Sequence, residues 1–263
     1  FVSQRCRFAV MAVKVAVIGA GGRMGLTVCE AVHADPDLEL VAAVDAYASG
    51  SVAGGVEIQR ELRAIAESGA QVAVDFTVIE AARVNLPWLA LHGVHAVVGT
   101  TGFSDDDLAL YASEFKSSNC LIAANFAIGA VLMMKFAEQA APYFETAEII
   151  EFHHDAKADA PSGTAMATAK RMAAASSDWA PDPTKTVVAE GARGGEGPAG
   201  IHVHAVRMRG MTAHQEVILG TMGQTLTIRH DSYDRSSFMP GVVLACKKIA
   251  DHPGLTIGLD SFL

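Results

Sequence analysis

The sequence predicts an α/β protein in two parts, a doubly wound parallel sheet and an α+β domain built on a mixed sheet. Through the first 125 residues, short apolar runs alternate with helix-like stretches, as in a parallel sheet covered on both faces. After residue 125, several strand-like runs follow one another closely. The tail returns to the first pattern. We therefore expect a discontinuous first domain, residues 11–125 and 235–263, and a second domain, residues 126–234.

Five runs rich in Val, Ala and Ile are the predicted strands of the first domain: 13–19, 38–45, 71–77, 94–100 and 120–125. Helices are expected between them at 24–34, 59–68, 79–92 and 104–116. Ser104 is a good helix start because it caps the helix and is followed by acids in the first turn. The tail adds a helix at 237–250 and a short strand at 255–259.

The second domain is expected to begin with a long helix, 128–144, and a strand, 146–152. Another helix, 163–175, precedes a loop rich in Pro and Gly, 177–200, that has no regular period. Three strands are then predicted at 201–208, 215–221 and 225–230, with Met222 and Gly223 in the turn between the last two.

The composition excludes several classes of protein. The 263 residues include 20 Lys+Arg and 29 Asp+Glu, a net charge of −9, with no long basic run, so we expect no nucleic-acid partner. No apolar run reaches the ~18 residues of a membrane span. Cys6, Cys29, Cys120 and Cys246 form no C-x-x-C pair, which argues against a disulfide framework or zinc site. We expect a cytoplasmic protein whose natural start is Met11.

A glycine-rich turn follows the first predicted strand. Gly19, Gly22 and Gly25 are spaced G-x-x-G-x-x-G, and Arg23 and Met24 lie inside the turn. Glycines let a backbone turn tightly and approach a pyrophosphate, whose charge is stabilised by a helix N-terminus. The turn therefore favours a Rossmann-like dinucleotide-binding domain. The alternative is a tight strand-to-helix turn without a ligand.

Asp45 ends the second predicted strand, twenty residues after Gly25, where a carboxylate accepts hydrogen bonds from an adenosine ribose. The alternative is an acid that caps a helix or a loop. No Arg follows Asp45 to bind a 2′-phosphate, although Arg23 in the glycine turn could approach one. The expected cofactor is NADH or NADPH, with NADH bound at least comparably to NADPH.

Three further strand ends carry residues suited to a nicotinamide ring: Phe76 and Thr77; Gly99, Thr100 and Thr101; Asn125 and Phe126. Ligands of open α/β sheets lie beyond the carboxyl ends of the strands, so these segments should converge. The hydroxyls and the Asn amide could hold the carboxamide, and Phe76 could pack on the ring. Each segment alone is better explained as an ordinary strand-to-loop transition, and only their shared position favours a site.

The densest group of chemically active residues lies at 151–165. His153 and His154 can donate protons near neutral pH, and Lys157 adds a positive charge. Ser162, Gly163 and Thr164 open a helix, and the free amides of its first turn can hold a carboxylate. This combination suits a small, doubly anionic substrate. The alternative is a solvated loop followed by a capped helix.

A metal site is the less favoured interpretation of the histidines. His202 and His204 alternate along one strand and, together with His153, His154 and Asp155, could bind zinc. Adjacent histidines rarely share a metal, and no other ligand spacing is recognisable. We therefore predict no metal.

These motifs resemble one known family, the dihydrodipicolinate reductases (4-hydroxy-tetrahydrodipicolinate reductases) of bacterial lysine and diaminopimelate synthesis. The resemblance runs from Val13 to Leu259 and is most specific in E-x-H-H-x-x-K-x-D-A-P-S-G-T-A, residues 151–165. It includes the segments 19–25, 75–77, 97–102 and 125–127. One departure is Ala124, where the family often has Pro, and it puts only the rigidity of that loop in doubt.

The resemblance implies a Rossmann-like domain closed by the C-terminal tail, and a mixed-sheet domain that binds substrate and builds a homotetramer. It implies NAD(P)H reduction of a small cyclic dicarboxylate with loss of water, giving tetrahydrodipicolinate. His153 would be the acid, with His154 and Lys157 beside the carboxylates and ring. Gly163 and Thr164 would bind a carboxylate. Hydride addition to an electron-poor ring carbon leaves an enamine-like carbanion, which independently requires a proton donor.

Three rival functions remain open from the sequence. Another nicotinamide enzyme, such as an amino-acid dehydrogenase, would share the front half without needing the His-His-Lys and Ser-Gly-Thr groups. A non-catalytic NAD-binding module would bind NADH without turnover. A metal hydrolase would show chelator-sensitive activity.

Overall fold

The computed structural model describes residues 12–263, and Met11 and Cys6 lie outside the described residues. The chain forms two compact units. Unit 1 runs to Phe126 and resumes at Phe238–Leu263, and unit 2 is Ala127–Ser237. The sequence analysis placed the domain boundaries after residues 125 and 234, and the two units divide after residues 126 and 237.

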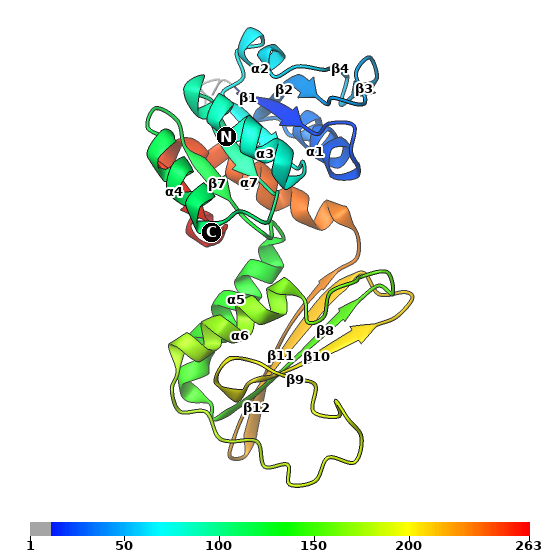
Figure 1. The fold of residues 1–263 in the computed structure, drawn as a ribbon, viewed down its shortest axis with the longest axis vertical. Helices are drawn as coiled ribbons and strands as arrows, with labels where there is room; N and C mark the ends of the chain where they lie inside the picture. The colour runs from blue at the N-terminus through cyan, green and yellow to red at the C-terminus, as the bar shows by residue number, and fades with distance from the viewer. Residues whose placement is uncertain (1–11) are drawn as a thin grey trace, which may run out of the picture. The chain divides into compact units, whose positions relative to one another are not determined.

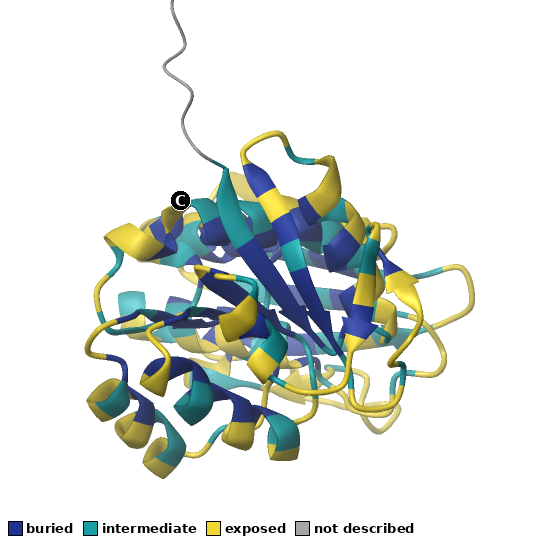
Figure 2. Ribbon diagram, turned by 90° about the horizontal axis from the view of Figure 1, so that it is seen from above, coloured by how far each residue is buried: buried dark blue, intermediate teal, exposed yellow. Residues whose placement is uncertain are grey.

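Unit 1 is built on an eight-stranded sheet with the order β13-β7-β6-β5-β1-β2-β4-β3, and every pairing except β3–β4 is parallel. The strands are β1 Val13–Ile18, β2 Leu38–Val44, β3 Val52–Ala53, β4 Val56–Gln59, β5 Val72–Asp75, β6 His95–Val98, β7 Cys120–Ile122 and β13 Leu255–Ile257. The central strands are dark blue along most of their length in Figure 2, because their apolar residues are covered on both faces. The predicted doubly wound α/β sheet is confirmed.

The helices of unit 1 are α1 Arg23–Ala34, α2 Arg63–Glu67, α3 Ile79–Leu91, α4 Asp105–Glu114 and α7 Met239–Lys248 (Figure 1). Residues of α2, α3 and α4 share one buried apolar cluster with the sheet, and α1 packs beside α7. Ser104 caps α4 in a capping box with Asp107, as its sequence predicts. The C-terminal tail completes this unit, since β13 pairs with β7.

The predicted helix 59–68 is wrong at its start. Val56–Gln59 forms β4, which pairs with β2 in parallel, and only Arg63–Glu67 is helical. Buried Ile58 lies between exposed Glu57 and Gln59, an alternation too short to stand out in the sequence. The long helix 128–144 also divides into α5, Ile128–Ala140, and a 3-10 turn, η1 Ala141–Tyr143, because Pro142 cannot donate a helical hydrogen bond.

Unit 2 is a five-stranded mixed sheet with the order β12-β11-β8-β10-β9. The strands are β8 Thr146–His153, β9 Gly195–Glu196, β10 His202–Arg207, β11 Ala213–Thr221 and β12 Gln224–Ser232. β8 and β10 are parallel, and the other pairings are antiparallel. Short β9 and the 3-10 turn η2, Pro198–Gly200, lie within the predicted loop 177–200.

Two helices, α5 and α6 (Gly163–Ala175), pack against each other and cover one face of this sheet (Figure 1). Buried Ile149, Val203 and Val217 are paired across three neighbouring strands and form the apolar centre beneath the helices. Among the helices of unit 2 (Ala127–Ser237), none covers the opposite face, where the guanidinium of Arg229 lies 5.3 Å from the ring centre of Phe152.

Cys29, Cys120 and Cys246 are buried free thiols. None of the helices in the described part of the chain has the length and apolarity needed to cross a membrane.

Candidate active site

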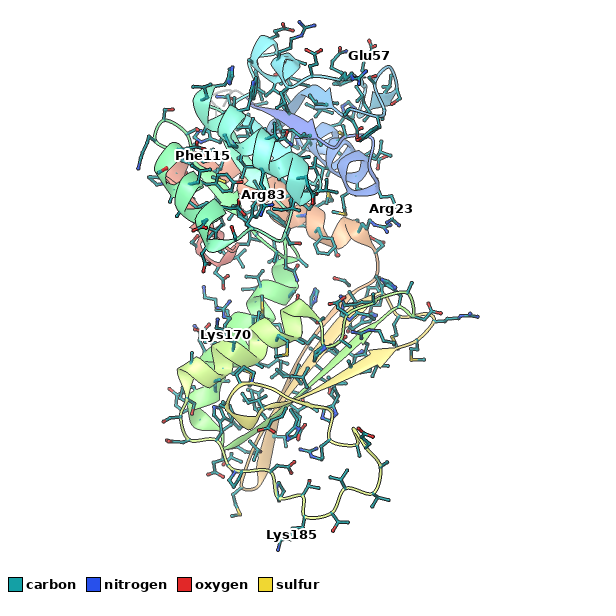
Figure 3. The ribbon with its side chains drawn as sticks, viewed as in Figure 1. Arg23, Glu57, Arg83, Phe115, Lys170 and Lys185 are labelled. Carbon is teal, nitrogen blue, oxygen red and sulfur yellow. The ribbon has the colours of Figure 1, made fainter. Side chains whose placement is uncertain are left out.

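The glycine turn joins β1 to α1 as predicted. Gly19 has a positive φ of 79°, a conformation that glycine adopts without strain. A Cβ atom at Gly25 would lie 2.0 Å from the carbonyl oxygen of Gly19, so α1 packs against the turn at a distance only glycine permits. This close approach fits a pyrophosphate at the helix N-terminus. Arg23 is exposed at the start of α1 (Figure 3).

Asp45 connects this turn to the loop after β2. Its carboxylate accepts hydrogen bonds from the backbone amides of Gly21 (3.1 Å), Tyr47 (2.8 Å) and Ala48 (3.2 Å). The acid therefore caps its own loop, the alternative that the sequence left open, while its two oxygens keep lone pairs for a ribose. Gly21 was not predicted as a site residue, yet a Cβ there would lie 2.2 Å from the Cβ of Ala48.

A cavity of about 360 Å³ opens beside Asp45. Of the predicted cofactor residues, it is lined by Gly19, Gly22, Asp45, Phe76 and Thr77. It is not lined by the others: Arg23, Met24, Gly25, Gly99, Thr100, Thr101, Asn125 and Phe126. The remaining walls include Tyr47, Leu62 and Val78, so the cavity suits a flat, largely apolar group such as adenine.

Arg60 also lines this cavity and was missed from the sequence. The sequence prediction placed Arg60 inside a helix, whereas it directly follows β4, the neighbour of β2. Arg60 is thus a second arginine, besides Arg23, that the fold brings near Asp45.

Asp75 organises the next two strand ends. This fully buried carboxylate accepts hydrogen bonds from the amide (2.9 Å) and hydroxyl (2.7 Å) of Thr77, the Thr100 hydroxyl (3.1 Å) and the Asn85 amide (2.8 Å). The two threonine hydroxyls, expected to hold a carboxamide, thus donate their protons inside the protein. They retain only acceptor lone pairs for a ligand.

The ring of Phe76 packs against Gly99 and Phe126, two residues that the sequence analysis predicted to bind the cofactor. A Cβ at Gly99 would lie 2.0 Å from the ring of Phe76, so glycine leaves room for that ring. The ring centre of Phe126 lies 5.7 Å from that of Phe76, and Phe126 is 1% exposed. Phe126 therefore supports Phe76 from the core. Thr101 is exposed and Asn125 half-buried.

In unit 2, His153 ends β8 and joins a network of charged groups. Its Nδ1 atom lies 2.5 Å from Oε2 of Glu151, which has no exposed surface. Arg207 on β10 donates to both oxygens of Glu151, at 2.7 and 2.8 Å. The amide of Ser162 donates to Oε1 at 3.0 Å. Glu151 and Arg207 are functional candidates that the sequence analysis missed, although Glu151 lies within the motif it singled out.

The electrostatic balance in this network keeps Glu151 ionised. Burial would raise the pKa of Glu151, but hydrogen bonds from Arg207, His153 and the Ser162 amide outweigh it and hold the pKa below its usual range. Burial lowers the pKa of His153, and Lys157 and Arg207 lower it further against the opposing effect of Glu151. The imidazole is therefore neutral more often than an exposed histidine at the same pH.

The first turn of α6 lies next to this network. Ser162 caps the helix by accepting a hydrogen bond from the Ala165 amide (3.2 Å), and it is 3% exposed. The polar atoms of Ser162 thus serve the helix and Glu151, a different task from the direct substrate contact expected of it. Gly163 is exposed and Thr164 half-buried in the first turn of α6.

The remaining predicted residues lie in the loop between β8 and α6. The ammonium of Lys157 is 2.7 Å from a carboxylate oxygen of Asp159, and its side chain is 21% exposed. His154 is exposed.

No group of three or more His, Cys, Asp or Glu side chains in residues 12–263 has the arrangement of a metal site. His202 instead lies 3.2 Å from Asp182, and His204 lies 2.7 Å from Glu148.

Both parts of the chain match models of one family. Residues 13–126 match "Dihydrodipicolinate reductase, N-terminus", and residues 129–263 match "Dihydrodipicolinate reductase, C-terminus". The chain belongs to the dihydrodipicolinate reductase family. The predicted family is thereby confirmed, and with it a nicotinamide-dependent oxidoreductase.

Individual family members match over nearly their whole length. The 4-hydroxy-tetrahydrodipicolinate reductase of Corynebacterium aurimucosum is 51% identical, covering 96% of this chain and 99% of its own. That of Streptomyces coelicolor is also 51% identical, covering 95% and 97%. The dipicolinate-bound dihydrodipicolinate reductase of Paenisporosarcina sp. TG-14 is 38% identical with a TM-score of 0.86, covering 96% of this chain and 100% of its own.

Proposed function

We propose that the protein reduces 4-hydroxy-tetrahydrodipicolinate with NADH or NADPH, releasing water and forming tetrahydrodipicolinate for lysine and diaminopimelate biosynthesis. Relatives about half identical over nearly the full chain carry the name of this reductase. A more distant relative binds dipicolinate, a small cyclic dicarboxylate. The observation that carries the proposal is that one buried carboxylate, Glu151, holds both His153 and the capped start of α6.

His153 is the proposed proton donor. When bound, a nicotinamide would supply a hydride, and the substrate ring would then need a proton from a nearby donor. Because Nδ1 of His153 faces Glu151, Nε2 is the atom left to transfer that proton. Lys157 is the proposed second catalytic group, acting on the charge and ring nitrogen of the substrate.

The substrate carboxylates are proposed to bind His154, Lys157 and the amides of Gly163 and Thr164. Helix N-termini stabilise anions through these amides and the helix dipole. A carboxylate that reaches Lys157 replaces its contact with Asp159, so the lysine stays neutralised throughout. Ser162 contributes by fixing the position of this turn.

The cofactor is proposed to bind unit 1. The pyrophosphate would lie on Gly19, Gly22, Arg23, Met24 and Gly25. The ribose would lie on Asp45. The nicotinamide would lie near Phe76, Thr77, Gly99, Thr100, Thr101, Asn125 and Phe126. We expect NADH to bind at least comparably to NADPH, since Asp45 offers acceptors to a free ribose hydroxyl.

A homotetramer formed through the sheet of unit 2 is the proposed assembly. Ile150, Phe152 and Ile218 are only half-buried on the face that the described helices leave uncovered. An apolar face of this kind is stabilised by a partner subunit.

A cytoplasmic location also stays a prediction.

A coupled assay tests the proposed activity. The substrate is made freshly by its synthase, and nicotinamide absorbance is followed after the reductase is added. We expect oxidation of NADH or NADPH that depends on the synthase product and survives a chelator. NADH binding without turnover would favour a non-catalytic module, and oxidation of free amino acids would favour the rival dehydrogenase.

A further inference from the structure

Glu151 connects two features that the proposed reaction uses. One oxygen, Oε2, lies 2.5 Å from Nδ1 of His153, and the other, Oε1, accepts the amide of Ser162 at 3.0 Å. Residues two apart on a strand point to the same face, so β8 presents Glu151 and His153 side by side. The same carboxylate therefore contacts the proposed acid and the N-cap of the helix proposed to hold a substrate carboxylate.

Arg207 allows this carboxylate to be buried. Residue 207 on β10 is paired with His153 across the parallel strands, which brings the guanidinium onto Glu151 in a two-pronged contact at 2.7 and 2.8 Å. It also donates to the carbonyl oxygen of Asp159 at 2.7 Å. A buried carboxylate with paired charge-assisted hydrogen bonds stays ionised and fixed in direction.

An ionised carboxylate only accepts hydrogen bonds, so the His153 nitrogen that faces Glu151 must carry a hydrogen. When neutral, the imidazole is then the Nδ1–H tautomer, with an open lone pair at Nε2. When protonated, it carries its transferable proton at Nε2 and shares its positive charge with Glu151.

We propose that Glu151 is a positioning residue of the reaction, which fixes the tautomer of His153 and holds the start of α6 in register with it. This proposal rests on the proposed function. Glu151 has no exposed surface, so its effect would reach a substrate through His153 and Ser162.

The charges around His153 define what removing Glu151 does. Glu151 on β8, Arg207 on β10 and Lys157 in the following loop act on the imidazole, and Asp159 neutralises Lys157. Glu151 is the negative charge in direct contact. In Glu151→Gln, His153 is left with two positive neighbours, so its protonated form becomes less favourable.

The chain provides a matched control on the same strand. Glu148 accepts from Nε2 of His204 at 2.7 Å and from Arg193 at 2.5 Å, so it is also a glutamate between a histidine and an arginine. It lies on the opposite side of β8 from Glu151, because the two are three residues apart. Glu148→Gln thus removes a similar ion pair without touching His153.

The first measurement is the ¹⁵N NMR signature of His153 in the unmodified full-length protein, which requires no turnover. We expect neutral His153 to carry its hydrogen on Nδ1. A neutral His153 protonated on Nε2 would overturn the proposal. If this tautomer is found but the synthase product is not reduced, the proposed function fails while the Glu151–His153 arrangement stands.

The second measurement is the pH profile of kcat/KM. In Glu151→Gln, we expect the alkaline limb to move to lower pH by about one unit or more, as loss of an adjacent opposite charge predicts. Glu151→Asp should restore part of this shift, and Glu148→Gln should leave the limb in place. An unmoved limb in folded Glu151→Gln would overturn the proposal, because a purely structural role does not set this pH dependence.

A second variant covers the case in which Glu151→Gln does not fold with Arg207 left unpaired. Glu151→Gln/Arg207→Met removes both charges, which is better tolerated than burying one alone. A smaller shift of the limb to lower pH is expected, because Arg207→Met also removes a positive charge that lowers the His153 pKa, and the absence of any shift in this variant would equally overturn the proposal.

Discussion

Nδ1 of His153 lies 2.5 Å from Oε2 of Glu151, two positions earlier on the same strand. The short i to i+2 spacing guarantees a common face, and the register of β8 with β10 adds Arg207 to the pair. His153 is the last residue of β8, and its imidazole is therefore oriented by Glu151 at the point where the chain leaves the sheet.

Replacing His153 separates proton transfer from binding. We expect His153→Gln to lower kcat by about 10²–10⁴-fold, the usual contribution of a general acid. Substrate binding should persist, because the proposed carboxylate ligands remain. Steady-state kinetics and calorimetric NADH affinity measure the two effects. His204→Gln, which alters the histidine paired with Glu148, is the control and should change kcat less than twofold. A His153→Gln enzyme within threefold of the parent would transfer the acid role to His154 or Lys157.

Lys157→Ala should impair both turnover and substrate binding, because a substrate carboxylate loses its neutralising partner. We expect a higher KM together with a lower kcat, and an unchanged NADH affinity. Lys185→Ala removes a lysine from the exposed loop 177–200 and should leave both constants unaltered (Figure 3). An increase in KM with no loss of kcat would restrict Lys157 to binding.

The pH dependence of activity follows from the direction of the His153 pKa. Burial lowers this pKa below the ordinary imidazole value of about 6.5. In the free enzyme, His153 therefore loses the proton that the reaction requires at a lower pH than an exposed histidine does. The value of kcat/KM should therefore fall as pH rises through that lowered pKa. Bound substrate carboxylates stabilise the imidazolium, so the corresponding fall in kcat should occur at higher pH. Coincident limbs for kcat and kcat/KM would argue against two bound carboxylates near His153.

Asp45→Ala should weaken NADH binding by about 1.5–3 kcal/mol for each hydrogen bond lost from the ribose. It also frees the amides of Gly21, Tyr47 and Ala48, so the glycine turn should loosen. Calorimetry with NADH and NADPH measures the change, and Glu57→Ala, an exposed acid on neighbouring β4, is the control. NADPH bound a hundredfold more tightly than NADH by the unmodified protein would contradict the expected preference.

Asp75→Ala tests the buried acceptor behind Thr77 and Thr100. Buried donors left without an acceptor cost about 1–3 kcal/mol each, so we expect the free energy of unfolding to fall by at least about 2 kcal/mol. Urea denaturation measures it, with exposed Glu67→Ala expected within about 0.5 kcal/mol of the parent. Equal stability of Asp75→Ala and the parent would mean that water replaces the carboxylate.

The hydrogen bonds of Arg83 are an example of a long-range contact that the sequence did not predict. Arg83 on α3, labelled in Figure 3, donates to both carboxylate oxygens of Asp107 on α4, which lies 24 residues away along the chain. The sequence predicted both helices and the capping role of Ser104, because those signals are local. The pairing between helices depends on the packing of two neighbouring elements, which periodicity does not specify.

The same difference between local signals and long-range contacts explains which site residues could be predicted from the sequence. The glycine turn, Asp45 and the start of α6 were recognisable because turns and helix starts leave local signals. Arg207 was not recognisable, because it lies on β10 and contacts Glu151 on neighbouring β8, 56 residues away along the chain. Arg60 was missed because β4 is too short to be distinguished from the helix that follows. The roles of Thr100 and Phe126 depended on burial, which the order of residues alone does not reveal.

Single-turnover oxidation of NADH is the decisive test of the proposed reduction and of His153 as its proton donor. Excess enzyme is mixed with freshly formed 4-hydroxy-tetrahydrodipicolinate, and the product is identified by mass spectrometry for the parent and His153→Gln. We expect rapid formation of tetrahydrodipicolinate by the parent and a rate at least about 10²-fold lower in the variant. Equal rates for the two proteins, or a parent that binds NADH without forming this product, would contradict it.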